Sequence, residues 1–160
     1  GLKGNALFLD LDVVIVDNID CFFQEKGEFL IIHDWKRPWR ITGNSSVYRF
    51  KLGSFPEILP YFREHFDEIR QKFRNEQAYL SWFVDAHGTL SYWNEDWCKS
   101  YKYHCLQKIP LAYFKPPVKP KGAKIIIFHG EINPPDAVNG GGGKWYRYVL
   151  PSDWIKDAWQ

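Results

Sequence analysis

Residues 6–16, ALFLDLDVVIV, form an apolar run that two aspartates interrupt, Asp10 and Asp12. A short run rich in Leu, Val and Ile is typical of a fully buried strand. Side chains two positions apart on a strand point to the same side, so the two carboxylates are expected to converge. Unpaired carboxylates there repel each other and lose hydration, so they need a partner. That partner is a neighbouring helix end, a nearby arginine, or a divalent cation such as Mg²⁺ or Mn²⁺, which oxygen ligands favour.

Strand and helix patterns alternate along the rest of the chain. The segment 54–73 has apolar residues at helical spacing behind a capping box, Ser54 with Glu57, and Pro60 predicts either a kink or a later start. Asn75 is placed to cap a second helix, and Asp17 and Asp20 read as turn and helix-cap residues. Other strands are expected at 27–35, 46–53, 89–93 and 123–130, a Pro-rich connector at 115–122, a loop at 133–145, and a last helix after Ser152. This mixture predicts an α/β fold in which a mixed sheet is flanked by helices.

Composition limits the classes of function. A chain of 160 residues, 45% of them hydrophobic, is expected to form a single domain over 1–160 with a packed core. The net charge of +2, spread along the chain, gives no reason to expect nucleic-acid binding. No segment is apolar for long enough to span a bilayer, and the first residues do not resemble a signal peptide. Three cysteines cannot all pair within the chain, so they read as reduced thiols, and a cytoplasmic location is expected.

Two classes of enzyme place Asp-x-Asp at the end of such a strand. The segment FLDLDVVIVD resembles the DxDGTLxD signature of haloacid-dehalogenase-type phosphatases, in which Asp10 would be the nucleophile and Asp12 the general acid. However, Val13 and Val14 stand where that family has its Gly-Thr turn. The C-terminal strand also ends in His-Gly rather than in an acidic pair. This phosphatase is one alternative hypothesis.

A second resemblance covers most of the chain. LFLDLDVVIVDNI resembles the metal-binding strand of nucleotide-sugar glycosyltransferases with the GT-A fold, and GNSSVYRF resembles the strand that follows it there. NEQAYL is similar to an acidic-Gln pair before an apolar helix, and IIIFHG with a later Lys-Trp is similar to their C-terminal strand. The order matches retaining galactosyl- and glucosyltransferases (family 8-like), so the chain resembles a bacterial relative of them. It departs from the family pattern at Ser46, where Gly is usual, and at Glu76, where Asp is common.

The resemblance implies roles for the matched residues. Asp10, Asp12 and His129 would hold Mn²⁺ or Mg²⁺, which bridges the diphosphate of a nucleotide sugar, with a UDP-sugar favoured. The other matched positions would contact the donor or a saccharide or lipid-linked acceptor, and they are Asn44, Ser45, Glu76, Gln77, Gly130, Lys144 and Trp145. From the residues alone, a turn is an equally good interpretation of Asn44 and Ser45. For Glu76 and Gln77, the capped first turn of a helix is an equally good interpretation.

Two further clusters have both a structural and a functional interpretation. The segment NGGGGKW is either a mobile surface loop or a lid that orders over the donor diphosphate. Cys98, His104 and Cys105 supply three zinc ligands without a fourth, which is more typical of a buried structural cluster.

The GT-A resemblance also implies a βαβ unit before the Asp-x-Asp strand, which would hold the nucleoside. The chain starts too close to that strand to contain it. We therefore expect the C-terminal portion of a transferase whose activity belongs to a longer parent protein or needs a partner chain. A truncated sheet would expose a strand edge, which favours a homo-oligomer. A noncatalytic carbohydrate-binding domain is the third hypothesis.

Overall fold

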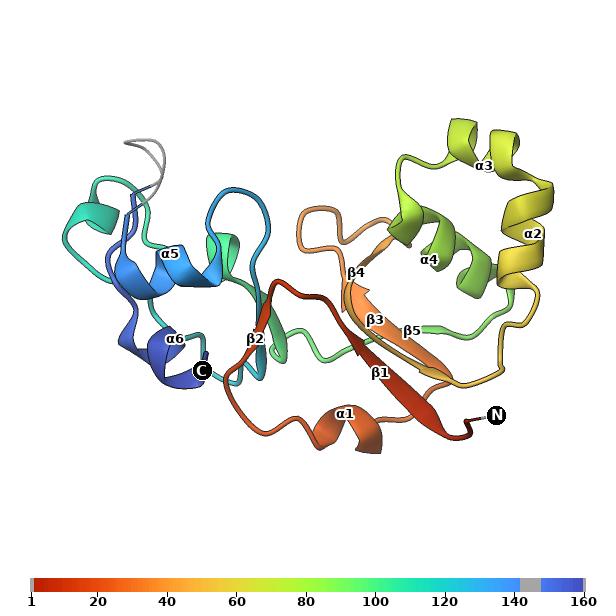
Figure 1. Cartoon of the computed structure of the whole chain (residues 1–160), viewed down its shortest axis with the longest axis horizontal. Helices are drawn as coiled ribbons and strands as arrows, with labels where there is room; N and C mark the ends of the chain where they lie inside the picture. The colour runs from red at the N-terminus through yellow and green to blue at the C-terminus, as the bar shows by residue number, and fades with distance from the viewer. Residues whose placement is uncertain (1, 142–147, 160) are drawn as a thin grey trace. The chain divides into compact units, whose positions relative to one another are not determined.

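The computed structural model describes residues 2–141 and 148–159 and shows an α/β fold with mixed sheets flanked by helices (Figure 1). The chain divides into two compact units. The first comprises Gly1–Leu9 and Phe22–Trp93, and the second comprises Asp10–Cys21 and Asn94–Gln160. A single domain over 1–160 stays a prediction. No helix in the described part of the chain is both long and apolar enough to cross a membrane.

The first unit contains a four-stranded mixed sheet. Its strands lie in the order β1 (Asn5–Leu9), β4 (Gly43–Lys51), β3 (Phe29–His33) and β5 (Leu90–Tyr92). Strand β4 is antiparallel to both β1 and β3, whereas β5 is parallel to β3. The expected strands at 27–35, 46–53 and 89–93 are therefore confirmed, although β4 begins earlier than its sequence pattern indicated.

Three helices gather on one side of this sheet, α2 (Ile58–Glu64), α3 (Phe66–Lys72) and α4 (Glu76–Ala86) (Figure 1). The cap of α4 is confirmed, because Asn75 Oδ1 accepts a hydrogen bond from the Ala78 N–H at 3.2 Å. The capping box expected from Ser54 and Glu57 is wrong, since Glu57 is the N-cap of α2 and makes no side-chain cap bond. Pro60 lies in the first turn of α2, where no intrahelical donor is needed, which agrees with the later start.

One continuous helix over 54–73 is also wrong, because the chain changes direction at His65 between α2 and α3. Packing explains the break. A buried cluster of Ile69, Tyr79 and Phe83 lies between α3 and α4, and Phe62 of α2 packs against the same cluster. Two short helices bring both aromatic and aliphatic residues onto α4. The apolar periodicity alone did not show this.

The second unit contains a three-stranded mixed sheet. Strand β7 (Ile125–Ile127) is its central strand, antiparallel to β2 (Val13–Ile15) and parallel to β6 (Cys98–Ser100). All three isoleucines of β7 are fully buried, as expected for a central strand. The unit also contains α5 (Pro134–Asn139), α6 (Asp153–Ala158), the π-helix η1 (Tyr101–Cys105) and the 3₁₀-helix η2 (Leu111–Tyr113). A short helix, α1 (Cys21–Gln24), begins at the sequence boundary between the units.

The prediction of one buried strand over 6–16 is wrong. Strand β1 ends at Leu9, β2 begins at Val13, and the two strands belong to different sheets. Of the residues in these two strands only Val14 is buried, and Leu11 between them is fully exposed. The Asp10 carboxylate accepts a hydrogen bond from the Leu11 N–H at 2.9 Å. Such a local bond competes with strand pairing, so the two aspartates lie in a turn that separates β1 from β2.

Two expectations near the C-terminus also need correction. Helix α5 occupies part of the expected loop, and it begins with two prolines that suit a first helical turn. The Asp136 carboxylate accepts a hydrogen bond from the Asn133 N–H at 3.0 Å, which closes this helix start. Ser152 stands at the N-cap of α6 as expected, but its Oγ bonds the Tyr101 hydroxyl at 2.9 Å rather than the helix.

Arg49 is a fully buried cation in the first unit, with 1% of its surface exposed. Its Nη1 donates to the Phe22 carbonyl and its Nη2 to the Gly27 carbonyl, both at 2.7 Å. The guanidinium also lies 5.8 Å from the centre of the Trp93 ring. These contacts join α1 and the segment after it to the middle of β4. Burial lowers the pKa of Arg49, and the charge of Glu25 opposes that shift.

Candidate functional site

The two aspartates lie in the second unit, in the turn that leads into β2. Asp10 is exposed, whereas Asp12 is partly buried. The Asp12 carbonyl accepts a hydrogen bond from the Phe128 N–H at 2.8 Å, which extends the pairing of β2 with β7. Asp12 Oδ1 is buried and has no hydrogen-bond partner among the described residues. Burial raises the pKa of Asp12, and the neighbouring charge of Asp10 raises it further, so the pair would be stabilised by a cation.

His129 lies just beyond the end of β7, and a buried serine orients it. His129 Nε2 is 2.7 Å from the Oγ of Ser100, the last residue of β6. Ser100 Oγ also accepts a hydrogen bond from the Tyr103 N–H at 3.3 Å. If Nε2 carries the proton and donates to Ser100, the lone pair of the imidazole is on Nδ1. Sequence reasoning missed Ser100, because no local pattern links it to a histidine 29 residues away.

The aspartates and His129 are at the same end of one strand pair. Val13, the first residue of β2, is paired with Ile127, the last residue of β7. No group of three or more His, Cys, Asp or Glu side chains within 2–141 and 148–159 is arranged to hold a metal ion. Coordination by Asp10, Asp12 and His129 together therefore stays a prediction. Two carboxylates still fit a Mg²⁺-type cation, which is commonly bound by one or two carboxylates and the phosphates of its substrate.

Three other predicted residues, Ser45, Glu76 and Gln77, meet in the first unit where β4 contacts the start of α4, and a fourth, Asn44, precedes Ser45 on β4. The Ser45 N–H donates to Gln77 Oε1 at 3.4 Å, and Ser45 Oγ donates to Glu76 Oε1 at 3.5 Å. Strand β4 is irregular here, since Ile31 of β3 pairs with Tyr48 but the next residue pairs with Asn44. Such a bulge redirects side chains, and Asn44 Oδ1 accepts from the Ser46 N–H at 3.0 Å, as in a turn.

Two residues that the sequence did not single out hold this cluster in place. The buried hydroxyl of Ser81 accepts a hydrogen bond from the Gly43 N–H at 2.9 Å and donates to the Gln77 carbonyl at 2.7 Å. Gly43 also lies against Ile31, so closely that a Cβ added there would be 2.7 Å from Ile31 Cγ2. A glycine directly before Asn44 is therefore required by close packing.

We predict that Gly43→Ala lowers the free energy of unfolding by about 2 kcal/mol, because the buried Ile31 has to move. Urea unfolding of the purified variant measures this value. Ile31→Ala, which removes the clashing atoms, is the partner for a double-mutant cycle. The double variant should lose less than the sum of the two single losses. Strict additivity would contradict the clash.

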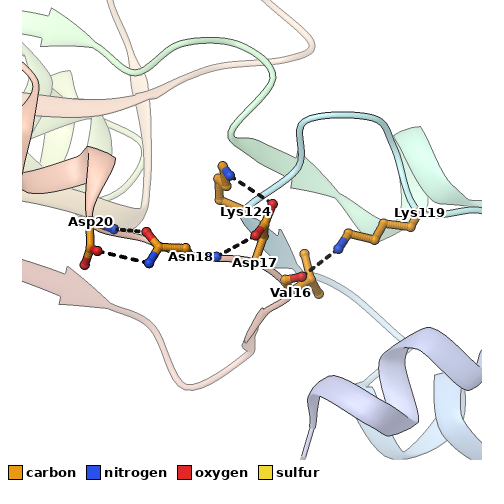
Figure 2. A network of polar contacts seen from close by, with 6 residues as sticks. All are labelled: Val16, Asp17, Asn18, Asp20, Lys119 and Lys124. Carbon is orange, nitrogen blue, oxygen red and sulfur yellow. Dashed lines mark hydrogen bonds and ion pairs between the residues drawn. The ribbon is translucent and has the colours of Figure 1, made fainter.

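The segment after the metal-site candidates is held by a polar network (Figure 2). Asp17 accepts hydrogen bonds from the Asn18 N–H at 2.8 Å and from Lys124 Nζ at 2.9 Å, and its pKa is lowered chiefly by the bond from Lys124. Asn18 Oδ1 accepts from the Asp20 N–H at 2.8 Å. Lys119 Nζ donates to the Val16 carbonyl at 2.6 Å. The turn interpretation of Asp17 and Asp20 is confirmed, and the DNID segment has a structural role.

The remaining candidates are distributed differently. Gly130 follows His129, is exposed and has a φ of +94°, which favours glycine. Lys144 and Trp145, with residues 142–145 of the segment NGGGGKW, lie outside the described residues, whereas Asn139 belongs to α5 and Gly141 pairs with Val149. Cys98 and Cys105 are buried and form no disulfide bond, and burial raises the pKa of the Cys105 thiol to about 12. The Ser100 N–H donates to His104 Nδ1 at 2.9 Å. These contacts favour the structural interpretation of the cysteine–histidine cluster.

Comparison of the chain with models of known protein families found no match, and comparison with curated proteins found none either. The functional interpretation therefore rests on the ordered motifs and on the geometry described above.

Proposed function

We propose that this chain is part of a metal-dependent glycosyltransferase of GT-A type, which transfers a sugar from a nucleotide-diphosphate sugar to a saccharide or lipid-linked acceptor. Asp10 and Asp12 would hold Mn²⁺ or Mg²⁺, and His129, which the structure does not group with them, would be the third protein ligand. The reaction takes place in this chain or in a longer parent protein that supplies the nucleoside-binding unit. A cytoplasmic location and a homo-oligomer belong to the same proposal.

The observation that carries the proposal is the state of the Asp12 carboxylate. One of its oxygens is buried without a hydrogen-bond partner among the described residues, and Asp10 adds a second negative charge nearby. A buried, unpaired carboxylate destabilises the folded chain, so a partner of opposite charge is expected. Mg²⁺ and Mn²⁺ suit such oxygen ligands, and a bound diphosphate completes their coordination.

The chain's own residues have separable roles in this chemistry. A bound divalent cation supplies Lewis-acid stabilisation of the charge on the departing nucleoside diphosphate. Ser100 positions His129 through the 2.7 Å contact at Nε2, as outer-shell groups commonly orient histidine ligands.

Calorimetric titration of UDP-glucose with Mn²⁺ or with EDTA tests the proposal. Binding is expected only with Mn²⁺. Pyrophosphate with Mn²⁺ is a second ligand, because it needs the carboxylates but no nucleoside-binding unit. Asp17→Asn is the control variant, because it removes a carboxylate that is not a proposed metal ligand and that Lys124 already neutralises. It should leave Mn²⁺-dependent binding unchanged. If neither UDP-glucose nor pyrophosphate binds in a Mn²⁺-dependent way, the proposal is wrong.

A further inference from the structure

A cavity of about 390 Å³ lies within the second unit, next to the end of β7. Its apolar lining includes the buried residues Tyr101, Pro117, Ile132 and Val149, and His129 reaches it from the candidate metal site. This volume falls in the range of small-molecule sites, which combine an apolar lining with a few polar groups. The cavity therefore has the size and character of a ligand site.

The charged residues of the cavity are mostly cationic. Lys102, Lys108 and Lys115 line it and are exposed, whereas Glu131 is its one acidic residue within the described part of the chain. None of the three lysines forms an ion pair with a described residue. Lysine binds phosphate well as a point charge, so three unneutralised ammonium groups around an apolar lining favour a ligand with an anionic group.

The cavity also offers surfaces for a ring. Tyr103 and Tyr148 both line it, and the Tyr103 ring centre lies 5.0 Å from that of His129. Aromatic side chains present a flat apolar face with a polar edge, which suits a pyranose ring. The donor diphosphate, by contrast, is expected at the two carboxylates with a cation. A phosphate that binds directly to these lysines is therefore an anionic group distinct from the donor diphosphate.

We propose that this cavity is the acceptor site, and that the acceptor is a phosphate-bearing saccharide. The phosphate contacts the exposed lysines, and the sugar ring lies against Tyr103 beside His129. The assignment to an acceptor rests on the proposed transferase function. The binding of a sugar phosphate to the cavity does not, and it is measured without metal or donor.

Calorimetric titration with glucose 6-phosphate in EDTA tests the inference. Binding is expected, and Lys108→Gln/Lys115→Gln should weaken it by about tenfold or more, because two charge-assisted contacts are lost. The control variant Lys121→Gln/Lys156→Gln changes two exposed lysines of the same unit outside the cavity and should bind as the wild type does. Glucose should bind at least about tenfold more weakly than its phosphate.

Absence of glucose 6-phosphate binding would overturn the inference, and so would three other results. Equal weakening by the control variant would show a general charge effect. Equal affinity for inorganic phosphate would show that the saccharide is not recognised. Lysine-dependent binding of UDP that displaces glucose 6-phosphate in EDTA would assign the cavity to the donor. Because metal is absent throughout, a failure here is distinct from a failure of Mn²⁺-dependent UDP-glucose binding.

Discussion

Asp12→Asn is expected to stabilise the metal-free protein at neutral pH and to abolish Mn²⁺-dependent ligand binding. The carboxylate has a buried oxygen without a partner among the described residues and a negative neighbour in Asp10. Asparagine keeps the shape of the side chain and removes the charge, so the folded state no longer contains a desolvated anion. The same change removes a cation ligand. Outer-shell substitutions already cost 10- to 100-fold in metal affinity, so we expect a loss of about 100-fold or more.

The pH dependence of stability follows from the raised pKa of Asp12. In the unfolded chain this group ionises at its ordinary pKa, whereas in the folded chain it ionises at a higher pH. Between the two values the folded state binds more protons, so stability falls as pH rises from the unfolded pKa through the folded one. The stability of Asp12→Asn should lack the part of this decline with rising pH that comes from Asp12.

Urea unfolding in EDTA, over a pH series from acidic to neutral, measures this difference between wild type and Asp12→Asn. Asp10→Asn is the matched comparison, because it relieves the repulsion but leaves the buried oxygen of Asp12 ionised. It should stabilise the protein less than Asp12→Asn does. A wild type more stable than Asp12→Asn at neutral pH in EDTA would contradict the account of the buried carboxylate.

Arg49→Leu is expected to lower the free energy of unfolding by about 3 kcal/mol, since it leaves two carbonyls without their donor. The guanidinium bonds the carbonyls of Phe22 and Gly27 at 2.7 Å, and leucine offers neither bond. The apolar replacement removes a buried charge, which offsets part of the loss. It cannot restore the hydrogen bonds that join α1 and the segment after it to β4.

Guanidinium chloride unfolding of the variant measures this loss. Arg49→Lys keeps the charge but offers a single ammonium group in place of the planar fork, so it should recover only part of the stability. Arg63→Leu, on the exposed face of α2, should stay within about 0.5 kcal/mol of the wild type. If Arg49→Leu is as stable as Arg63→Leu, the two carbonyl bonds do not hold the first unit together.

The burial of Arg49 is a feature that could not be predicted from the sequence. In the segment SVYRFKLG an arginine within an alternating pattern reads as a residue of the exposed face. The structure buries it, because its partners are backbone carbonyls 22 and 27 residues earlier in the chain. Backbone carbonyls carry no sequence signal, so no local pattern could have identified them.

The sequence by itself determined the elements whose causes are local. The apolar run of β3 and the Asn75 cap of α4 depend on neighbours within a few residues, and both are confirmed. The sequence also located the two carboxylates, although it did not show that they divide an apolar run between two sheets. That division depends on pairing with β4 and β7, which lie far along the chain.

Only the tertiary structure decided which distant residues meet. It brings Ser45 to Glu76 and Gln77 through a bulge in β4, and it places Ser100 beside His129 through the parallel pairing of β6 with β7. It also leaves one oxygen of Asp12 buried without a described partner. Strand register and burial are set by the packing of the whole unit. For this reason the motifs, read one at a time, could predict Asp12, Ser45 and His129 but not Ser100, and they could not predict the contacts of these residues.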